Sequence, residues 1–343
     1  MHGGDIYRNQ VTLDFSVNIN PLGMPESVRQ ALRDAVEDCT CYPDERQEAL
    51  RAAIGAWEGV PSDWVLCGNG ASELFPAIVR GLRPKRILIP VPSFLGYEKA
   101  AKAWDADLRF YEMKAEKGFR LDEGILPLLT KDLSLVFLAN PNNPVGNRIA
   151  PDLLEQVLVR CREQGIAVIL DECFLGLTEQ DGSRSYFPRL EEFPRLFVVS
   201  AFTKLFAIPG VRLGYLGCGD PQLRDIVEAQ LPEWNLSVFA QRAGAAAVGE
   251  RGYCRRSRSL IAQERAYLAE GLGRLGIQVY PSETNFLLFY TEVPLAKELL
   301  ERGILIRDCE NFRGLKKGYY RAAIRQRAEQ DRLLAEIGAI ICR

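Results

Sequence analysis

The 343-residue sequence contains a single histidine, His2, and this scarcity removes several classes of enzyme. A Ser-His-Asp triad and a histidine-based zinc site both require imidazole groups, so neither is expected unless that terminal histidine serves. The nine cysteines include no CxxC pair, and Cys39 and Cys41 stand too close together for metal-ligand spacing. We expect no metal site. With no signal-peptide pattern at the N-terminus, the odd number of cysteines favours reduced thiols in a cytoplasmic protein.

Long apolar runs and an excess of one charge are also missing. No run reaches 18 apolar residues, so no membrane-spanning helix is expected. The net charge is only −2, which leaves no strong field to attract nucleic acid or an anionic membrane. No GxGxxG follows the first predicted strand, and no GK[ST] follows the glycine-rich turn at 68–70, which argues against a dinucleotide or P-loop nucleotide site. Neither nucleic acid nor a membrane is therefore expected as a partner.

Short apolar runs separated by amphipathic stretches fill the middle of the chain. Such nearly continuous apolar runs are typical of strands that helices cover on both faces, and their alternation with helical stretches predicts an α/β fold with a mostly parallel seven-stranded sheet. Helices are expected between the strands, for example over Glu73–Gly81 and Pro151–Gln164. The predicted strands are Val65–Cys67, Arg86–Pro90, Leu108–Met113, Leu135–Ala139, Ala167–Leu170, Phe197–Ser200 and Gly214–Gly217.

The character of the sequence changes after about residue 221. A long helical region, Pro221–Gly273, precedes short strand-like segments and one more helix, which together predict a smaller α+β domain. We expect an N-terminal segment at 1–38 that joins this domain and the active site, a large cofactor-binding domain at 39–235, and the small domain at 236–343.

Lys204 directly follows one of the predicted strands and precedes a glycine-bearing loop that contains Arg212. An amine in that place is partly removed from water, which lowers its pKa and makes it nucleophilic towards an aldehyde. A lysine whose stem is buried while its ammonium reaches solvent is an equally ordinary interpretation of the same pattern.

Three further polar features follow other predicted strands. Asp171 ends one strand and would face the crevice where open α/β sheets bind ligands, where it could pair with a protonated pyridine nitrogen, cap a helix or hold Mg²⁺. Asn143 offers a neutral donor to a phenolate-like oxygen. The turn Gly68–Glu73 opens a helix and, with Ser72, is suited to hold a phosphate. Amine, carboxylate, oxygen donor and phosphate cradle together are the groups that a pyridoxal 5′-phosphate site requires.

The sequence resembles the fold-type-I pyridoxal-phosphate enzymes across essentially the whole chain, and within them the histidinol-phosphate aminotransferase-like branch. The motifs that carry this resemblance are Gly-Asn-Gly-Ala-Ser-Glu (68–73), Asn-Pro-Asn-Asn-Pro-Val-Gly (140–146), Asp-Glu (171–172), Thr-Lys (203–204), Arg212 and Ala-Ile-Arg (323–325). The segments 2–5, 14–25, 207–210 and 306–311 are most similar to the L-threonine-O-3-phosphate decarboxylase subgroup of cobalamin biosynthesis.

The resemblance implies a role for each matching residue. Lys204, Asp171 and Asn143 would be catalytic, with Lys204 carrying the cofactor as a Schiff base. Tyr42 would reach a cofactor phosphate in the neighbouring subunit of a homodimer. The other cofactor contacts implied are Gly70, Ala71, Ser72, Phe94, Thr203 and Arg212. The substrate contacts implied are His2, Gly3, Asn18, Arg307, Arg321 and Arg325, although Arg307 and Arg321 are as readily interpreted as structural ion-pair residues.

Two positions depart from the family pattern. Phe174 stands where many aminotransferases have a tyrosine that bonds the ring oxygen of the cofactor, and phenylalanine there resembles the decarboxylase subgroup. Ala201 occupies a position where serine or threonine often contacts the cofactor phosphate. Ser200 is adjacent but would point to the opposite face of an extended strand, so one phosphate contact is expected to be missing.

The resemblance to the decarboxylase subgroup implies decarboxylation of L-threonine O-3-phosphate, without consumption of a keto acid, and thus a small phosphorylated amino acid as the substrate. Transamination of histidinol phosphate or an aromatic amino acid, with 2-oxoglutarate as acceptor, is the alternative within the same fold. A cofactor-binding protein without catalysis is a third possibility, which the intact set of Lys204, Asp171, Asn143 and Arg325 disfavours.

Overall fold

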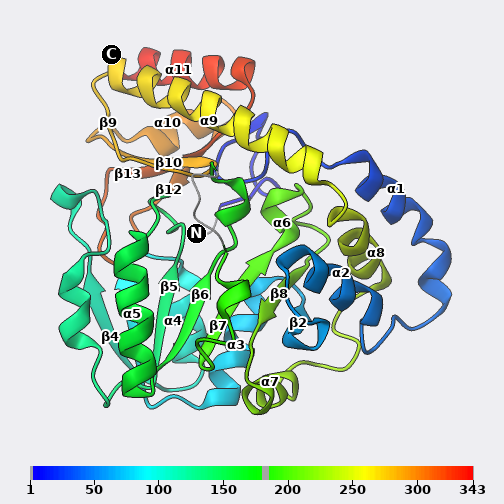
Figure 1. The fold of residues 1–343 in the computed structure, drawn as a ribbon. Helices are drawn as coiled ribbons and strands as arrows, with labels where there is room; N and C mark the ends of the chain where they lie inside the picture. The colour runs from blue at the N-terminus through cyan, green and yellow to red at the C-terminus, as the bar shows by residue number, and fades with distance from the viewer. Residues whose placement is uncertain (1–2, 180–184, 343) are drawn as a thin grey trace.

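The computed structural model describes residues 3–179 and 185–342, and its largest unit is a seven-stranded sheet (Figure 1). The strand order is β2-β8-β7-β6-β5-β3-β4, and only β8 runs antiparallel to its neighbours. All seven predicted strands are confirmed, with ends within one residue of the prediction. The strands are β2 (Val65–Gly68), β3 (Arg86–Val91), β4 (Asp107–Glu112), β5 (Leu135–Ala139), β6 (Ala167–Asp171), β7 (Leu196–Ala201) and β8 (Gly214–Gly217).

Alternate side chains of these strands enter two separate cores, one on each face of the sheet. In β6, Val168 and Leu170 join one core, whereas Ala167 and Ile169 join the other. The first core is covered by α2 (Glu48–Glu58), α5 (Pro151–Gln164) and α8 (Val238–Ala247). The second is covered by α3 (Ala71–Leu82), α4 (Leu95–Lys102) and α7 (Pro221–Glu228). Burial on both faces explains why these strands are apolar along their whole length.

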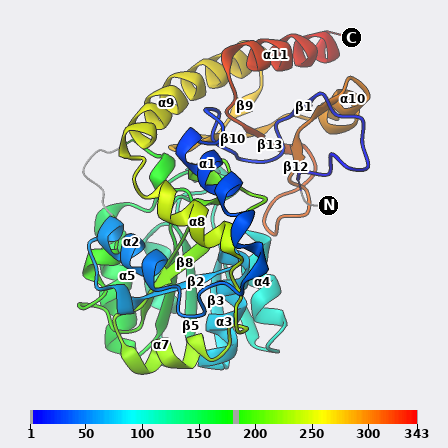
Figure 2. The ribbon, with the colours of Figure 1, turned by 90° about the vertical axis from the view of Figure 1, so that its right-hand side faces the viewer.

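A smaller α+β unit lies over the large sheet and contains the last described helix of the chain, α11 (Figures 1 and 2). Its four-stranded antiparallel sheet has the order β12-β13-β10-β9 and packs against two long helices. Near the N-terminus, β1 (Leu13–Asp14) pairs in parallel with β11 (Ile304–Leu305), so this segment is bound to the smaller unit. The other elements here are β9 (Gln278–Val279), β10 (Phe286–Tyr290), β12 (Arg307–Asp308), β13 (Tyr319–Ala323), α9 (Arg251–Arg274), α10 (Leu295–Glu301) and α11 (Arg327–Ile341).

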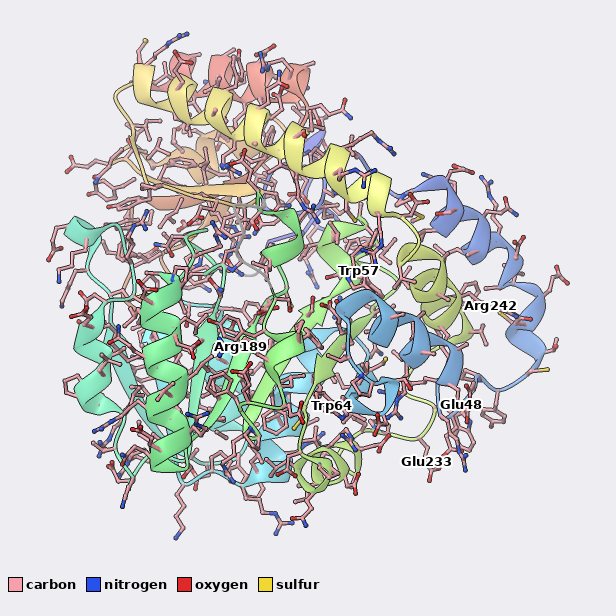
Figure 3. The ribbon with its side chains drawn as sticks, viewed as in Figure 1. Glu48, Trp57, Trp64, Arg189, Glu233 and Arg242 are labelled. Atoms are coloured by element: carbon pink, nitrogen blue, oxygen red, sulfur yellow. The ribbon has the colours of Figure 1, made fainter. Side chains whose placement is uncertain are left out.

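The predicted long helical region at Pro221–Gly273 is divided into α7, α8 and α9 rather than continuous. A new helix begins at α8 because the Ser237 side chain accepts a hydrogen bond from the backbone of Ala240 and so caps it. The start of α9 is tied to the large unit, since the Arg251 guanidinium lies over the ring of Trp57, 5.1 Å from its centroid (Figure 3). The two units are thus held by side-chain contacts as well as by the chain itself.

The remaining helices are short connections. Two α-helices, α1 (Glu26–Asp34) and α6 (Phe202–Leu205), flank the junction of the two units. The 3₁₀ turns are Glu37–Thr40, Ser62–Trp64, Ala115–Lys117, Glu123–Leu128, Leu175–Leu177 and Phe187–Arg189. Within 3–179 and 185–342, no helix is both long and apolar enough to cross a membrane.

Candidate active site

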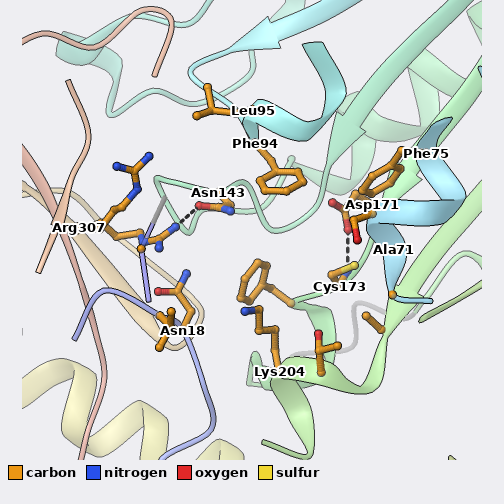
Figure 4. A pocket seen from close by; sticks show the side chains of 18 of the residues that line it. Asn18, Ala71, Phe75, Phe94, Leu95, Asn143, Asp171, Cys173, Lys204 and Arg307 are labelled. Atoms are coloured by element: carbon orange, nitrogen blue, oxygen red, sulfur yellow. Dashed lines mark hydrogen bonds between the residues drawn. The ribbon is translucent and has the colours of Figure 1, made fainter. Parts of the chain in front are cut away.

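A cavity of about 280 Å³ opens between the two units, at the carboxyl ends of the parallel strands (Figure 4). This is the edge where ligands bind in open α/β sheets. The four polar features predicted at separate strand ends all meet here. From the large unit come Gly70, Ala71, Ser72, Phe94, Asn143, Asp171, Thr203, Lys204 and Arg212, and from the N-terminal segment and small unit come Gly3, Ser16, Asn18, Arg307, Phe312 and Arg321.

Lys204 lies in α6, immediately after β7, and its side chain projects into the middle of the cavity (Figure 4). Burial lowers the pKa of its amine from the usual 10.5 to about 8, and the positive charges of Arg321 and Arg212 act in the same direction. The neutral fraction at neutral pH is therefore larger than for an ordinary lysine, and the neutral amine is the nucleophilic form.

One end of the cavity is built to hold an anion. Gly70 precedes α3 with φ of 76°, a left-handed conformation that favours glycine, and a Cβ there would come within 2.4 Å of the Arg212 guanidinium, which would have to move aside. Arg212 itself has φ of 62° and donates a hydrogen bond of 2.9 Å to the Ser72 hydroxyl. Backbone amides at the helix start, a hydroxyl and a guanidinium therefore converge where a phosphate group would fit.

In the view of Figure 4, Asn143 and Asp171 both lie above Lys204, Asn143 to the left and Asp171 to the right. Asp171 is buried at the end of β6 and accepts a 2.9 Å hydrogen bond from the backbone nitrogen of Cys173. Asn143 follows β5 and accepts a 2.5 Å hydrogen bond from Arg321. The carboxylate, the amine and the amide thus lie at or just after the carboxyl ends of three different strands, β6, β7 and β5.

Two buried arginines face the cavity from the small unit. Arg321 also donates a 2.9 Å hydrogen bond to the Ser16 carbonyl, and burial lowers its pKa to about 10. Arg307 donates to Asn311 at 2.7 Å and lies over the Phe312 ring. Among the described residues, Nε of Arg321 and Oδ1 of Asn18 are buried polar atoms without a hydrogen-bond partner. Buried polar atoms are normally satisfied, so these two point to a bound ligand.

The two departures from the family pattern have clear structural consequences. Phe174 lines the cavity and packs edge-on against Phe286 at 5.1 Å, so it offers no hydroxyl. Ala201 lines the cavity. Ser200 is not among the described cavity residues and instead lies near Tyr215. The alternation expected of an extended strand accounts for this arrangement.

The structure corrects the placement of Arg325. It is not among the described cavity residues and instead pairs with Glu329, with Nε and Nη2 at 3.2 and 2.8 Å from the same oxygen. The reason is that β13 ends at Ala323, so strand alternation no longer directs Arg325 into the cavity, and Glu329 lies four residues on in the first turn of α11. Arg321, inside the strand, points into the cavity in its place.

Another predicted residue, Tyr42, does not line this cavity. It is 81% exposed and packs against Trp234 with 4.8 Å between ring centroids and a tilt of 36°, so its predicted contact would need a second copy of the chain. His2 lies outside the described residues. Sequence reasoning in turn missed Phe312 and Cys173, which line the cavity but carry no motif of their own.

A model of the family described as aminotransferase class I and II matches residues 10–337. The chain belongs to this family. It is 36% identical over 353 residues to threonine-phosphate decarboxylase of Salmonella typhimurium, covering 99% of this chain and 96% of the relative. It is 34% identical over 330 residues to a histidinol-phosphate aminotransferase of an Anaeromyxobacter species, covering 94% of this chain and 89% of the relative.

The solved structures agree with this assignment. The histidinol-phosphate aminotransferase of Clostridium acetobutylicum superimposes with a TM-score of 0.90 at 31% identity, covering 96% of this chain and 99% of that one. This class I and II aminotransferase family member therefore has the fold-type-I architecture and is an enzyme that depends on pyridoxal 5′-phosphate. Its cavity fits that cofactor, because an anion cradle, a nucleophilic amine and a buried carboxylate lie within one enclosure.

Proposed function

We propose that this enzyme decarboxylates L-threonine O-3-phosphate to (R)-1-aminopropan-2-ol O-phosphate, a step of cobalamin biosynthesis. The observation that carries the proposal is the pair of buried guanidinium groups, Arg307 and Arg321, on the side of the cavity away from the phosphate cradle. The substrate has two anionic groups, a carboxylate and a phosphate, and two arginines match them in charge and in hydrogen-bond geometry. The 36% identity to the Salmonella typhimurium decarboxylase supports the same choice.

Residues around Lys204 would hold the cofactor. Lys204 would bind it covalently, Asp171 would pair with its ring nitrogen, and Asn143 would bond its ring oxygen. When bound, the cofactor supplies an electron sink for the electrons left at Cα. Its phosphate would be held by Gly70, Ala71, Ser72, Thr203 and Arg212, and Phe94 would contact its ring.

The side chains of the enzyme decide which substrate bond breaks. Arg321 holds the carboxylate through its free Nε, Arg307 holds the phosphate, and Asn18 offers its Oδ1 to a protonated phosphate oxygen. Loss of CO₂ leaves the bonding electrons at Cα, and Lys204 Nζ returns one proton to that carbon. An amine whose pKa is near 8 can both lose and regain a proton near neutral pH.

Transamination of histidinol phosphate or an aromatic amino acid, with 2-oxoglutarate as acceptor, is the second candidate. The Anaeromyxobacter and Clostridium relatives favour it, since both are named histidinol-phosphate aminotransferases. Phe174 favours decarboxylation, because the phenylalanine resembles the decarboxylase subgroup.

The proposal extends to the setting of the enzyme. We propose a cytoplasmic homodimer in which Tyr42, exposed in the single chain, reaches the cofactor phosphate of the second copy. Its partners would be a small phosphorylated amino acid and a second copy of itself, with no nucleic acid and no membrane.

The products test the proposal directly. The holoenzyme is incubated with L-threonine O-3-phosphate, and separately with histidinol phosphate, each with and without 2-oxoglutarate, and products are measured by mass spectrometry. We expect the amino alcohol phosphate from threonine phosphate with no dependence on 2-oxoglutarate. Glutamate formed from 2-oxoglutarate and histidinol phosphate, with no amine from threonine phosphate, would contradict the proposal.

A further inference from the structure

The Asp171 carboxylate has a second hydrogen-bond donor that lies behind the cavity wall. Tyr97, in α4, donates its phenol hydrogen to Oδ2 of Asp171 over 2.5 Å, while the backbone nitrogen of Cys173 donates to Oδ1. Tyr97 is only 1% exposed and is not among the described residues that line the cavity in Figure 4. Its hydroxyl therefore reaches the active site only through Asp171.

Aromatic packing holds the Tyr97 ring in one orientation. The ring stacks on Phe137, with centroids 4.8 Å apart and an interplanar angle of 17°, and Phe75 meets it edge-on at 5.2 Å. An enclosed phenol must place its hydroxyl on a polar partner, because an unsatisfied buried hydroxyl is costly. Here that partner is the Asp171 carboxylate at the end of β6. The packing of the Tyr97 ring therefore fixes the direction from which Asp171 receives this hydrogen bond.

The state of Asp171 depends on its donors. Burial raises the pKa of this carboxyl group, and hydrogen bonds from Cys173 and Tyr97 lower it. A buried carboxylic acid without such donors tends to keep its proton, and a protonated group cannot balance a positive charge.

We propose that Tyr97 is a positioning residue that keeps Asp171 as a carboxylate directed at the ring nitrogen of the cofactor. The inference rests on the proposed role of Asp171, and it holds for decarboxylation and transamination alike. Tyr97 contributes without touching the cofactor, which separates it from Phe94 and Lys204 in the cavity itself.

Cofactor affinity of the apoenzyme provides the first test. Tyr97→Phe removes only the hydroxyl, and we expect pyridoxal phosphate to bind about 10- to 100-fold more weakly, the range for a lost hydrogen bond to a charged group. Tyr280→Phe is the matched control, since that buried hydroxyl pairs with Tyr319 at 3.2 Å in a different aromatic cluster. Equal affinity in Tyr97→Phe and the wild type would overturn the inference.

A double-mutant cycle shows whether the hydroxyl acts through Asp171. In an Asp171→Asn background, Tyr97→Phe should cause no further loss of cofactor affinity, because there is no carboxylate left to keep ionised. Full additivity of the two losses would overturn the role of Tyr97 while leaving that of Asp171 intact. If Asp171→Asn alone bound the cofactor normally, the proposed site itself would be refuted.

The pH dependence of apoenzyme melting provides a readout without cofactor. Because its folded pKa is raised, ionised Asp171 destabilises the fold, and this effect disappears as the pH falls and the group takes a proton. Losing the Tyr97 hydrogen bond raises that pKa further, so the melting temperature of Tyr97→Phe should fall further below that of the wild type as the pH rises, and the difference should shrink as the pH falls. A deficit independent of pH would indicate packing alone and contradict the inference.

Discussion

The Lys204 amine allows a quantitative test of the electrostatics of the site. Burial first, and then the charge of Arg321, lower its pKa from 10.5 to about 8. At pH 7.5 about a quarter of the Lys204 side chains would then be neutral, against about one in a thousand for an ordinary lysine, a gain of roughly 200-fold in nucleophile. Competitive labelling of the apoenzyme with trace acetic anhydride, followed by peptide mass spectrometry, measures this titration, with a lysine peptide as the internal standard.

Removal of the positive charge of Arg321 tests how much that charge lowers the pKa of Lys204. Arg321→Gln deletes the largest contribution from a neighbouring positive charge, and we expect the Lys204 midpoint to rise by about one pH unit. Arg325→Gln is the matched control, because its guanidinium is paired with Glu329 and is not among the described cavity residues. A Lys204 midpoint above pH 10 in the wild-type apoenzyme, or equal shifts in both variants, would refute this reasoning.

Three further outcomes follow from the same contacts. Arg325→Ala should leave the substrate KM within about twofold. It should cost at most about 1 kcal/mol of unfolding free energy, because the ion pair of Arg325 with Glu329 is partly exposed. A tenfold increase of KM in steady-state kinetics would contradict this expectation. Arg307→Met should raise the KM of the phosphorylated substrate about tenfold or more, with cofactor affinity unchanged in an absorbance titration. Burial raises the pKa of Glu58 to about 7, so its ionised form destabilises the fold increasingly from about pH 4.5 to 7. Glu58→Gln should therefore raise the melting temperature at pH 8 but not near pH 4.5, and a uniform change would count against this account.

The large sheet could be predicted because its strands are buried on both faces. Runs such as Leu135–Ala139 and Ala167–Leu170 are apolar at every position, so their ends are marked by the first polar or glycine residue. The cofactor cavity could be predicted for the same reason. Polar residues that end such strands lie at one edge of the sheet, where ligands bind in open α/β folds. The helical region after Pro221 was less predictable, because its breaks depend on local caps such as Ser237.

Two positions differ from what the sequence predicts, one because of a local ion pair and one because of a tertiary contact. Arg325 was predicted to meet the substrate from its motif, but an acidic residue four positions later, Glu329, was the available sign of a local ion pair. Tyr97 was overlooked because it lies on a helix, away from every strand end, and only the fold brings it to Asp171. Pairings between distant segments of this kind leave no periodic pattern in the sequence.

Competition between the two candidate substrates tests the central proposal most directly. The holoenzyme is given equal concentrations of carboxyl-¹³C L-threonine O-3-phosphate and histidinol phosphate, together with 2-oxoglutarate, and the reaction is followed by NMR. We predict that the label appears as CO₂ and bicarbonate while histidinol phosphate persists. Retention of the label in threonine phosphate, with histidinol phosphate consumed and glutamate formed, would contradict the account.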